Sequence, residues 1–300
     1  RQWERRVLLS TYKTFGCESG NPTFRYTLVD GVKDGFLVNL QAIDCRTDIT
    51  TQLLSDKGYA VQVQTEEGQE EETIFSQRDF ERSFFSEKTN MEFCKTFMQN
   101  AQKDPISGEI GKGIVFCVSR KHASRITQIL NTYAHQMFPG KYNSDFAVQV
   151  TSNIPESQEM TISFANNNLN GHTTFKEGYK SSKTRICVTV GMMTTGYDCE
   201  DLLNICLMRP IFSPTDFVQI KGRGTRVFAF KYTLRNNDKK ETVRIEKKNY
   251  KLFDFFANCE YFEEKYPYDQ VIQLPPTGGI EPPPPPPPPP IPQTVTIDIP

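Results

Sequence analysis

Short apolar runs alternate with amphipathic segments through the second half of this chain. Ile114–Val118 and Ile186–Val190 are almost wholly apolar and contain β-branched residues, which is typical of strands buried on both faces of a parallel sheet. Lys121–Met137 and Glu156–Phe164 have apolar residues at helical spacing. Strands that alternate with helices predict an α/β fold with a doubly wound parallel sheet. Further strands are predicted at Phe146–Val150, Leu202–Met208 and Tyr250–Phe256.

The first third of the chain shows shorter patterns. Thr23–Leu28, Phe36–Ile43 and Tyr59–Gln64 are predicted to be short strands, because glycines or a polar turn separate them. We expect these strands to precede the parallel sheet as linking segments. Gln77–Gln102 has phenylalanines near i, i+3 and i+4 spacing, which predicts a helix.

Three polar segments lack a clear period. Asn166–Tyr179 is predicted to be irregular, and Lys231–Lys248 is predicted to be a charged excursion from the sheet. Residues 267–300 include nine consecutive prolines, Pro282–Pro290, which favour an extended polyproline II rod. A linker or tail explains this run more simply than docking to an SH3-like partner.

A helix is predicted to begin at Ser213-Pro214. Serine suits the N-cap, proline suits the first turn, and Asp216 complements the helix dipole. At helical spacing, one face of this helix carries a glutamine, a glycine and two arginines: Gln219, Gly222, Arg223 and Arg226. Such a face is a poor core but suits a polyphosphate, because guanidinium groups match phosphate oxygens.

Polar loops follow three of the predicted strands. Ser119 follows Ile114–Val118, Thr151 follows Phe146–Val150, and Thr194-Thr195-Gly196-Tyr197-Asp198 follows the third strand. Ligands of doubly wound sheets bind outside the carboxyl ends of the strands. We therefore expect these loops to line one edge of the sheet.

Composition restricts the possible classes of protein. The net charge is −1, so any nucleic acid would bind through a local groove rather than through bulk charge. The eight cysteines form no C-x-x-C pair, and three histidines are too few for an evident zinc site. We interpret the cysteines as reduced core thiols of a cytosolic protein. There is no signal-peptide pattern, and no apolar run approaches the length of a membrane span.

The ordered polar motifs resemble those of superfamily 2 helicases and translocases. Gln219-x-x-Gly222-Arg223-Gly224-Thr225-Arg226 is similar to motif VI, Thr194–Asp198 to motif V, and Gly113–Ala123 to motif IV. Arg209-Pro210 and Tyr26–Leu37 make the resemblance closest to the restriction (R) subunit of type I restriction–modification enzymes. The resemblance covers residues 20 to 260 and implies a second RecA-like motor lobe.

The resemblance implies an ATP-facing set of residues. Arg226 would be an arginine finger toward the γ-phosphate, with Arg223 and Gln219 as its catalytic neighbours. Gly196, Asp198 and Gly222 would lie against the nucleotide, with Asp198 touching the ribose or coupling to motif VI. A surface ion pair is the simpler alternative for Arg226, and a helix cap is the simpler alternative for Asp198.

The resemblance also implies contacts with the DNA backbone. Ser119, Thr151 and Thr195 would bind phosphates, since hydroxyls at strand ends position a backbone without reading its sequence. Ordinary loop capping is an equally good explanation for each. Lys121 and His122 could add charge, although solvated residues at a helix start account for them more simply.

The chain lacks G-x-x-x-x-G-K-[ST], and Gly111-Lys112-Gly113 does not replace it. ATP and Mg²⁺ would therefore be held mainly by a first lobe. Residues 1–75 would end that lobe and link it onward, 76–266 would form the second lobe, and 267–300 would be the tail. Implied partners are duplex DNA and the methylation and specificity subunits. The alternatives are a type III restriction subunit, a repair helicase, or a non-catalytic nucleic-acid-binding RecA-like domain.

Overall fold

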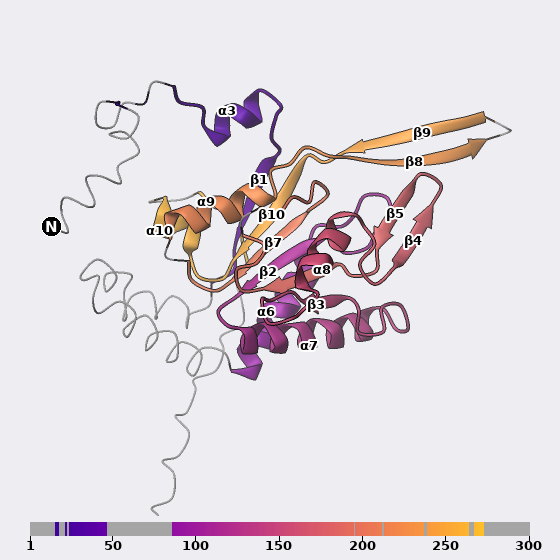
Figure 1. The fold of residues 1–300 in the computed structure, drawn as a ribbon, viewed down its shortest axis with the longest axis horizontal. Coiled ribbons are helices and arrows are strands. Elements are labelled where there is room, and N and C mark those ends of the chain that lie inside the picture. Colours follow the sequence, from indigo (N-terminus) through magenta and orange to yellow (C-terminus); the bar gives the residue numbers. More distant parts are fainter. Residues whose placement is uncertain are drawn as a thin grey trace, which may run out of the picture.

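A seven-stranded parallel sheet forms the centre of the computed structural model, which describes residues 16–17, 22, 24–46, 86–194, 196–211, 213–236, 239–263 and 267–272 (Figure 1). The strand order is β11-β1-β10-β7-β2-β6-β3, and every neighbouring pair is parallel. The strands are β1 (Asn39–Asp44), β2 (Gly113–Cys117), β3 (Ala147–Gln149), β6 (Ile186–Thr189), β7 (Asn204–Met208), β10 (Asn249–Asp254) and β11 (Gln270–Val271). The predicted α/β fold with a doubly wound parallel sheet is confirmed.

Helices cover both faces of this sheet. Successive side chains of each strand point to opposite faces, so alternate residues pack against different helices. Val115 and Cys117 pack with α6 (Glu87–Asn100) and α7 (Arg120–Met137). Ile114 and Phe116 pack on the other face, where Phe164 of α8 (Ser157–Ala165) and Phe217 of α9 (Pro214–Arg223) also lie. The apolar runs of the sequence therefore form a sheet that is buried on both sides.

The predicted start of α9 is confirmed. Ser213 is the N-cap, its side chain accepts a hydrogen bond of 3.2 Å from the backbone N–H of Asp216, and Pro214 is the first helical residue. Ser119 caps α7 in the same way. These helix starts were predictable because a cap is a local interaction.

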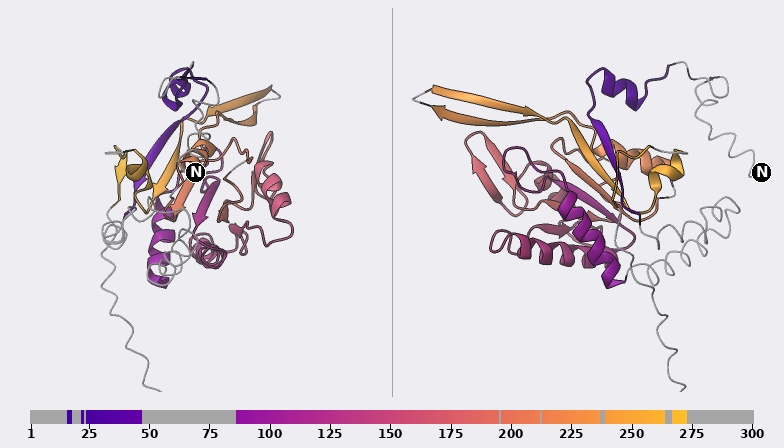
Figure 2. Two further views of the ribbon diagram at one scale, coloured as in Figure 1. Left: turned by 60° about the vertical axis from the view of Figure 1, so that its left-hand side comes forward. Right: turned by 180° about the vertical axis from the view of Figure 1, so that it is seen from behind.

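Two segments that the sequence analysis described as irregular or as a charged excursion are β-hairpins. β4 (His172–Lys176) pairs with β5 (Tyr179–Ser182), and β8 (Ala229–Asn236) pairs with β9 (Lys239–Glu246). The prediction for Asn166–Tyr179 is therefore wrong from His172 onward. The β8–β9 ribbon extends well past the edge of the main sheet in opposite views of the molecule (Figures 1 and 2).

The N-terminal part differs from the predicted linking strands. Residues 24–27 are not a strand and lead into α3 (Leu28–Lys33), which begins with a capping box between Thr27 and Asp30. β1 was expected before the sheet, but it pairs with β10 inside the sheet along its whole length. A pairing partner some 200 residues away leaves no local signal. Three predicted segments lie wholly or partly outside the described residues: the strand Tyr59–Gln64, the beginning of the helix Gln77–Gln102, and the tail from residue 273 onward. Gln270–Val271, which were predicted to belong to the tail, form β11 and pair with β1 in the main sheet.

Seven of the cysteines are buried, as expected for core thiols, and Cys17 is half-buried. No helix in the described ranges is both long and apolar enough to cross a bilayer.

Candidate functional site

The residues with similarity to motif VI reach the amino edge of the sheet, which is the side at which its parallel strands begin; the carboxyl edge is the side at which they end. α9 begins just after β7, at the carboxyl edge, and its ten residues run back by about 15 Å. The backbone N–H of Val38 then donates to Thr225 O at 2.8 Å, and Arg226 forms an isolated bridge with Leu37, just before β1. Arg226 therefore lies beyond the end of α9, and the prediction that it belongs to the helical face is wrong.

Arg223 joins α9 to the loop that resembles motif V. Its Nε donates to Thr194 O at 2.9 Å, its Nη1 donates to Tyr197 O, and its Nη2 donates to Gln219 Oε1 at 3.2 Å. Partial burial and the nearby Arg226 charge lower the pKa of Arg223 from its ordinary value, but an arginine stays charged at neutral pH. The two motifs are thus one hydrogen-bonded unit.

Arg226 pairs with Asp198, the acidic residue among the site candidates. Its Nε lies 2.9 Å from Asp198 Oδ1, and the two side chains are 45% and 60% exposed. A pair this exposed contributes at most about 1 kcal/mol to the free energy of unfolding. The guanidinium therefore faces solvent and keeps donors for an anion.

Two glycines of the site border open space. A Cβ built on Gly222 or on Gly196 would meet no atom within 4 Å. Gly196 has a φ of +69°, a left-handed conformation that favours glycine. Gly224 is different, since a Cβ there would overlap the ring of buried Tyr250. The surface beside Gln219 and Arg223 is therefore open at Gly222 and closely packed at Gly224.

Lys247 is a site residue that sequence reasoning missed. Its ammonium is buried and donates to Gly224 O at 2.8 Å and to Glu200 O at 3.0 Å. Burial is the main cause that lowers the pKa of Lys247 to about 8. Lys247 is preceded and followed by charged residues in the sequence, so no pattern distinguished it from a solvated lysine.

The candidate DNA-binding residues lie at the opposite, carboxyl edge. Arg120 Nη2 donates to Ser152 Oγ at 3.2 Å, and Gln149 Nε2 donates to Arg120 O at 3.1 Å, so the loops of Ser119 and Thr151 meet there. The Ser119 hydroxyl caps α7, and the buried Thr151 hydroxyl donates to Asn153 Oδ1 at 2.7 Å. Thr195 lies outside the described residues. The expectation that all three loops share one edge is wrong for Gly196 and Asp198, because their loop reaches across to α9.

Lys112 is a structural cation. Its buried ammonium lies 2.7 Å from Asp201 Oδ1 and donates to Phe164 O at 2.6 Å. It therefore does not serve as a phosphate-loop lysine. Within the described ranges, no cluster of His, Cys, Asp and Glu has the arrangement of a metal site.

His122 is buried rather than solvated, so it adds no charge to the carboxyl edge. Its Nδ1 accepts a 3.4 Å hydrogen bond from the backbone N–H of Val118, and its Nε2 lies 3.1 Å from Asn90 Oδ1. Because Nδ1 is an acceptor, Nε2 carries the proton. Burial, assisted by the Arg125 charge, lowers the pKa of His122 from 6.5 to about 3.

This pKa predicts acid sensitivity. Between pH 6.5 and 3 the unfolded chain binds a proton at His122 that the folded chain does not, so the free energy of unfolding falls as pH falls. The slope is about 1.4 kcal/mol per pH unit in this window. Urea unfolding of the unmodified chain and of His122→Gln at several pH values measures how the free energy of unfolding depends on pH. The variant should be less stable at pH 7 but show a shallower loss on acidification, and parallel curves would contradict this origin.

Comparison with known proteins supports the resemblance that the motifs suggested. No protein-family model matches the chain. The chain is 27% identical to the type I restriction enzyme EcoAI endonuclease subunit of Escherichia coli over 209 residues, which cover 69% of this chain and 23% of that protein. It is 25% identical to the EcoKI endonuclease subunit of Escherichia coli K12 over 245 residues, which cover 78% of this chain and 18% of that protein.

The chain thus spans less than a quarter of the length of the curated relatives that it matches. Among solved structures, a fragment of a proposed HsdR subunit of a type I restriction enzyme from Vibrio vulnificus matches with a TM-score of 0.49 and 21% identity. That match covers 90% of this chain and 42% of that one.

Proposed function

We propose that this chain is the second RecA-like lobe of an ATP-dependent DNA translocase in the endonuclease subunit of a type I restriction enzyme. The observation that supports this most is the unit formed by Arg223, Arg226 and Asp198 beside the open surface at Gly222. Similarity to two type I endonuclease subunits supports the assignment of the parent protein to the type I restriction enzymes. The whole protein would act in the cytoplasm.

The residues at the amino edge fit a nucleoside triphosphate that is held mainly by another lobe. A polyphosphate needs cations with free donors and room to approach, and Arg226 and Gly222 offer both. Bound ATP, with its Mg²⁺, would supply a phosphoanhydride whose hydrolysis drives movement. Arg226 would face the terminal phosphate, Arg223 and Gln219 would support it, and Gly196, Gly222 and Asp198 would lie along the nucleotide.

The carboxyl edge would follow the backbone of duplex DNA. Ser119 would bind a phosphate there, and Thr151 would shape the loop beside it, since its own hydroxyl already donates to Asn153. Thr195 stays a proposed phosphate contact whose position the structure does not describe. Such contacts position DNA without reading its sequence. Recognition of a target sequence and its methylation would belong to partner subunits, and cleavage would belong to a separate nuclease domain.

Two alternatives differ in kind. Another superfamily 2 motor, such as a type III restriction subunit or a repair helicase, would share the loops similar to motifs V and VI. A non-catalytic RecA-like domain that only binds nucleic acid would need no arginine facing a nucleotide. The exposed Arg226 favours the motor over the second alternative.

The chain alone is expected to hydrolyse no ATP above background, because it contains no phosphate-binding P-loop. Phosphate release by the purified chain, measured with and without duplex DNA, tests this. DNA-stimulated turnover by the chain alone would refute the proposal that it supplies only one side of the ATP site.

A further inference from the structure

The β8–β9 ribbon has two unlike faces. Along β8 the apolar residues Phe230, Tyr232 and Leu234 alternate with Lys231, Thr233 and Arg235. Phe230 is buried and its ring contacts Tyr179 of β5 edge-on, so the apolar face packs on the lobe at the base of the ribbon. The alternate residues form the other face, on which Lys231 and Arg235 are exposed and Thr233 is half-buried beside Gly178 in the β4–β5 turn.

Like charges stand directly opposite each other on that exposed face. Lys231 pairs in register with Arg244, and Arg235 pairs with Lys240; all four side chains are exposed, and we call this set the basic face. Thr233 and Thr242 form the row between the two basic rows. Like charges in directly opposed positions destabilise a hairpin. The stability of the ribbon therefore does not explain why cations occupy both sides of each row.

Carboxylates near the ribbon neutralise only part of this charge. Glu177, in the turn of the β4–β5 hairpin, lies 2.6 Å from Arg235 Nε and 3.1 Å from Lys240 Nζ. Glu246 lies 3.2 Å from Arg244 Nη2. Lys231 has no ion pair among the residues that the structure describes.

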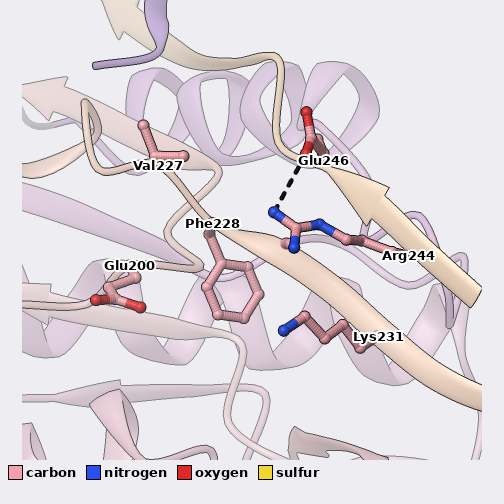
Figure 3. Close-up of a pocket in the computed structure, with 7 residues that line it drawn as sticks. Glu200, Val227, Phe228, Lys231, Arg244 and Glu246 are labelled. Carbon is pink, nitrogen blue, oxygen red and sulfur yellow. Dashed lines mark ion pairs between the residues drawn. The ribbon is translucent and has the colours of Figure 1, made fainter. Parts of the chain in front are cut away.

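The row of Lys231 and Arg244 opens onto a shallow recess at the base of the ribbon, lined also by Phe228, Glu200 and Glu246. Figure 3 shows the Lys231 ammonium and the Arg244 guanidinium extending into this recess. Two cations thus share an open recess with two carboxylates, of which Glu246 pairs with Arg244, and the Lys231 ammonium is the cation that an anionic group can approach most directly.

We propose that the basic face of the β8–β9 ribbon binds the sugar–phosphate backbone of duplex DNA, an inference that rests on the proposed function and adds a contact surface to it. The two basic rows are four residues apart along β8, which is about 13 Å. A single small anion cannot neutralise both rows, but an extended polyanion can. The exposed Thr242 hydroxyl between the rows is a suitable donor to a phosphate oxygen.

The salt dependence of DNA binding by the complete subunit tests this inference. Two double variants each neutralise one row: Lys231→Gln with Arg244→Gln, and Arg235→Gln with Lys240→Gln. Each phosphate contact contributes about 0.9 to the slope of log affinity against log salt. Each variant should therefore lower that slope by about 2 on labelled duplexes of unrelated sequence. Its melting temperature should change little, because each variant removes a like-charge pair together with exposed ion pairs to Glu177 or Glu246, which contribute little to stability.

A control removes the same charge elsewhere. Lys95→Gln with Arg125→Gln changes two exposed cations on α6 and α7, which cover a face of the main sheet away from the ribbon, and should leave the slope unchanged. An unchanged slope in both ribbon variants, with DNA binding intact, would overturn this inference but not the proposed function. Absence of DNA binding by the unmodified subunit would overturn both. Loss of binding to a partner subunit, with DNA binding kept, would identify a protein interface instead and would also overturn it.

Discussion

Replacing Arg226 with alanine in the complete endonuclease subunit is expected to lower DNA-stimulated ATP hydrolysis by about 10³-fold or more, as for arginines that stabilise phosphoryl transfer. Nucleotide affinity should fall much less, because such an arginine acts mainly in the transition state. The melting temperature should change little, since Arg226 is 45% exposed and pairs only with exposed Asp198 among the residues described. Turnover, nucleotide affinity and melting temperature measured on one variant separate these effects.

Arg125→Ala is a matched control for this experiment. Arg125 is also 45% exposed and also pairs with one exposed carboxylate, that of Glu87, but it lies on α7, away from the amino edge. It should keep normal turnover. Arg226→Lys should not restore activity, because an ammonium lacks the planar fork of a guanidinium. Normal ATP hydrolysis by Arg226→Ala would remove the main support for a motor.

Gly224→Ala is expected to lower the free energy of unfolding by about 1–3 kcal/mol, the usual cost of forcing an extra methyl group into a packed site. The new Cβ would overlap the Tyr250 ring, which is held in place because its hydroxyl donates to Lys221 O at 2.6 Å. The main chain at Gly224 would have to move, and Arg223 and Arg226 with it. Urea unfolding and ATP hydrolysis should both be impaired.

Gly222→Ala, two residues before Gly224, separates the effect of packing on stability from an effect on ATP hydrolysis. A Cβ there meets nothing within 4 Å, and alanine favours a helix over glycine by up to about 1 kcal/mol. This variant should therefore be as stable as the unmodified protein or more stable. Reduced ATP hydrolysis in the same variant would support close approach of a nucleotide to Gly222. Equal loss of stability in the two glycine variants would contradict the packing described here.

Local interactions made much of the fold predictable. The buried strands, the helix starts at Ser119 and Ser213, and the polar loops after the strands depend on neighbours within a few residues. The end of α9 was mispredicted because a distant segment decides it. Thr225 O accepts a hydrogen bond from Val38, and this pairing draws Arg226 out of the helix.

The β8–β9 ribbon had a strand pattern in the sequence, but the surrounding charges favoured a different prediction. Alternation of Phe230, Tyr232 and Leu234 with polar residues is a strand pattern, but the many charges around it suggested a solvated excursion. Lys247 had no signal at all, since only the folded chain brings Glu200 O and Gly224 O to its ammonium. The spacing of the sequence singled out Arg223 and Arg226 as candidates, but their position at the amino edge depends on the path of the whole of α9.

The segment between β6 and β7, residues 190–203, starts at the carboxyl edge of the sheet and ends at the amino edge. Contacts from three other parts of the chain hold it along the way: Arg223 of α9 at Thr194 and Tyr197, Lys247 just after β9 at Glu200, and Lys112 just before β2 at Asp201. Fixing the backbone of a loose loop costs about 1–2 kcal/mol of conformational entropy per residue. The four contacted residues incur that cost when the lobe folds, so a ligand that binds near them has little of their conformational entropy left to remove.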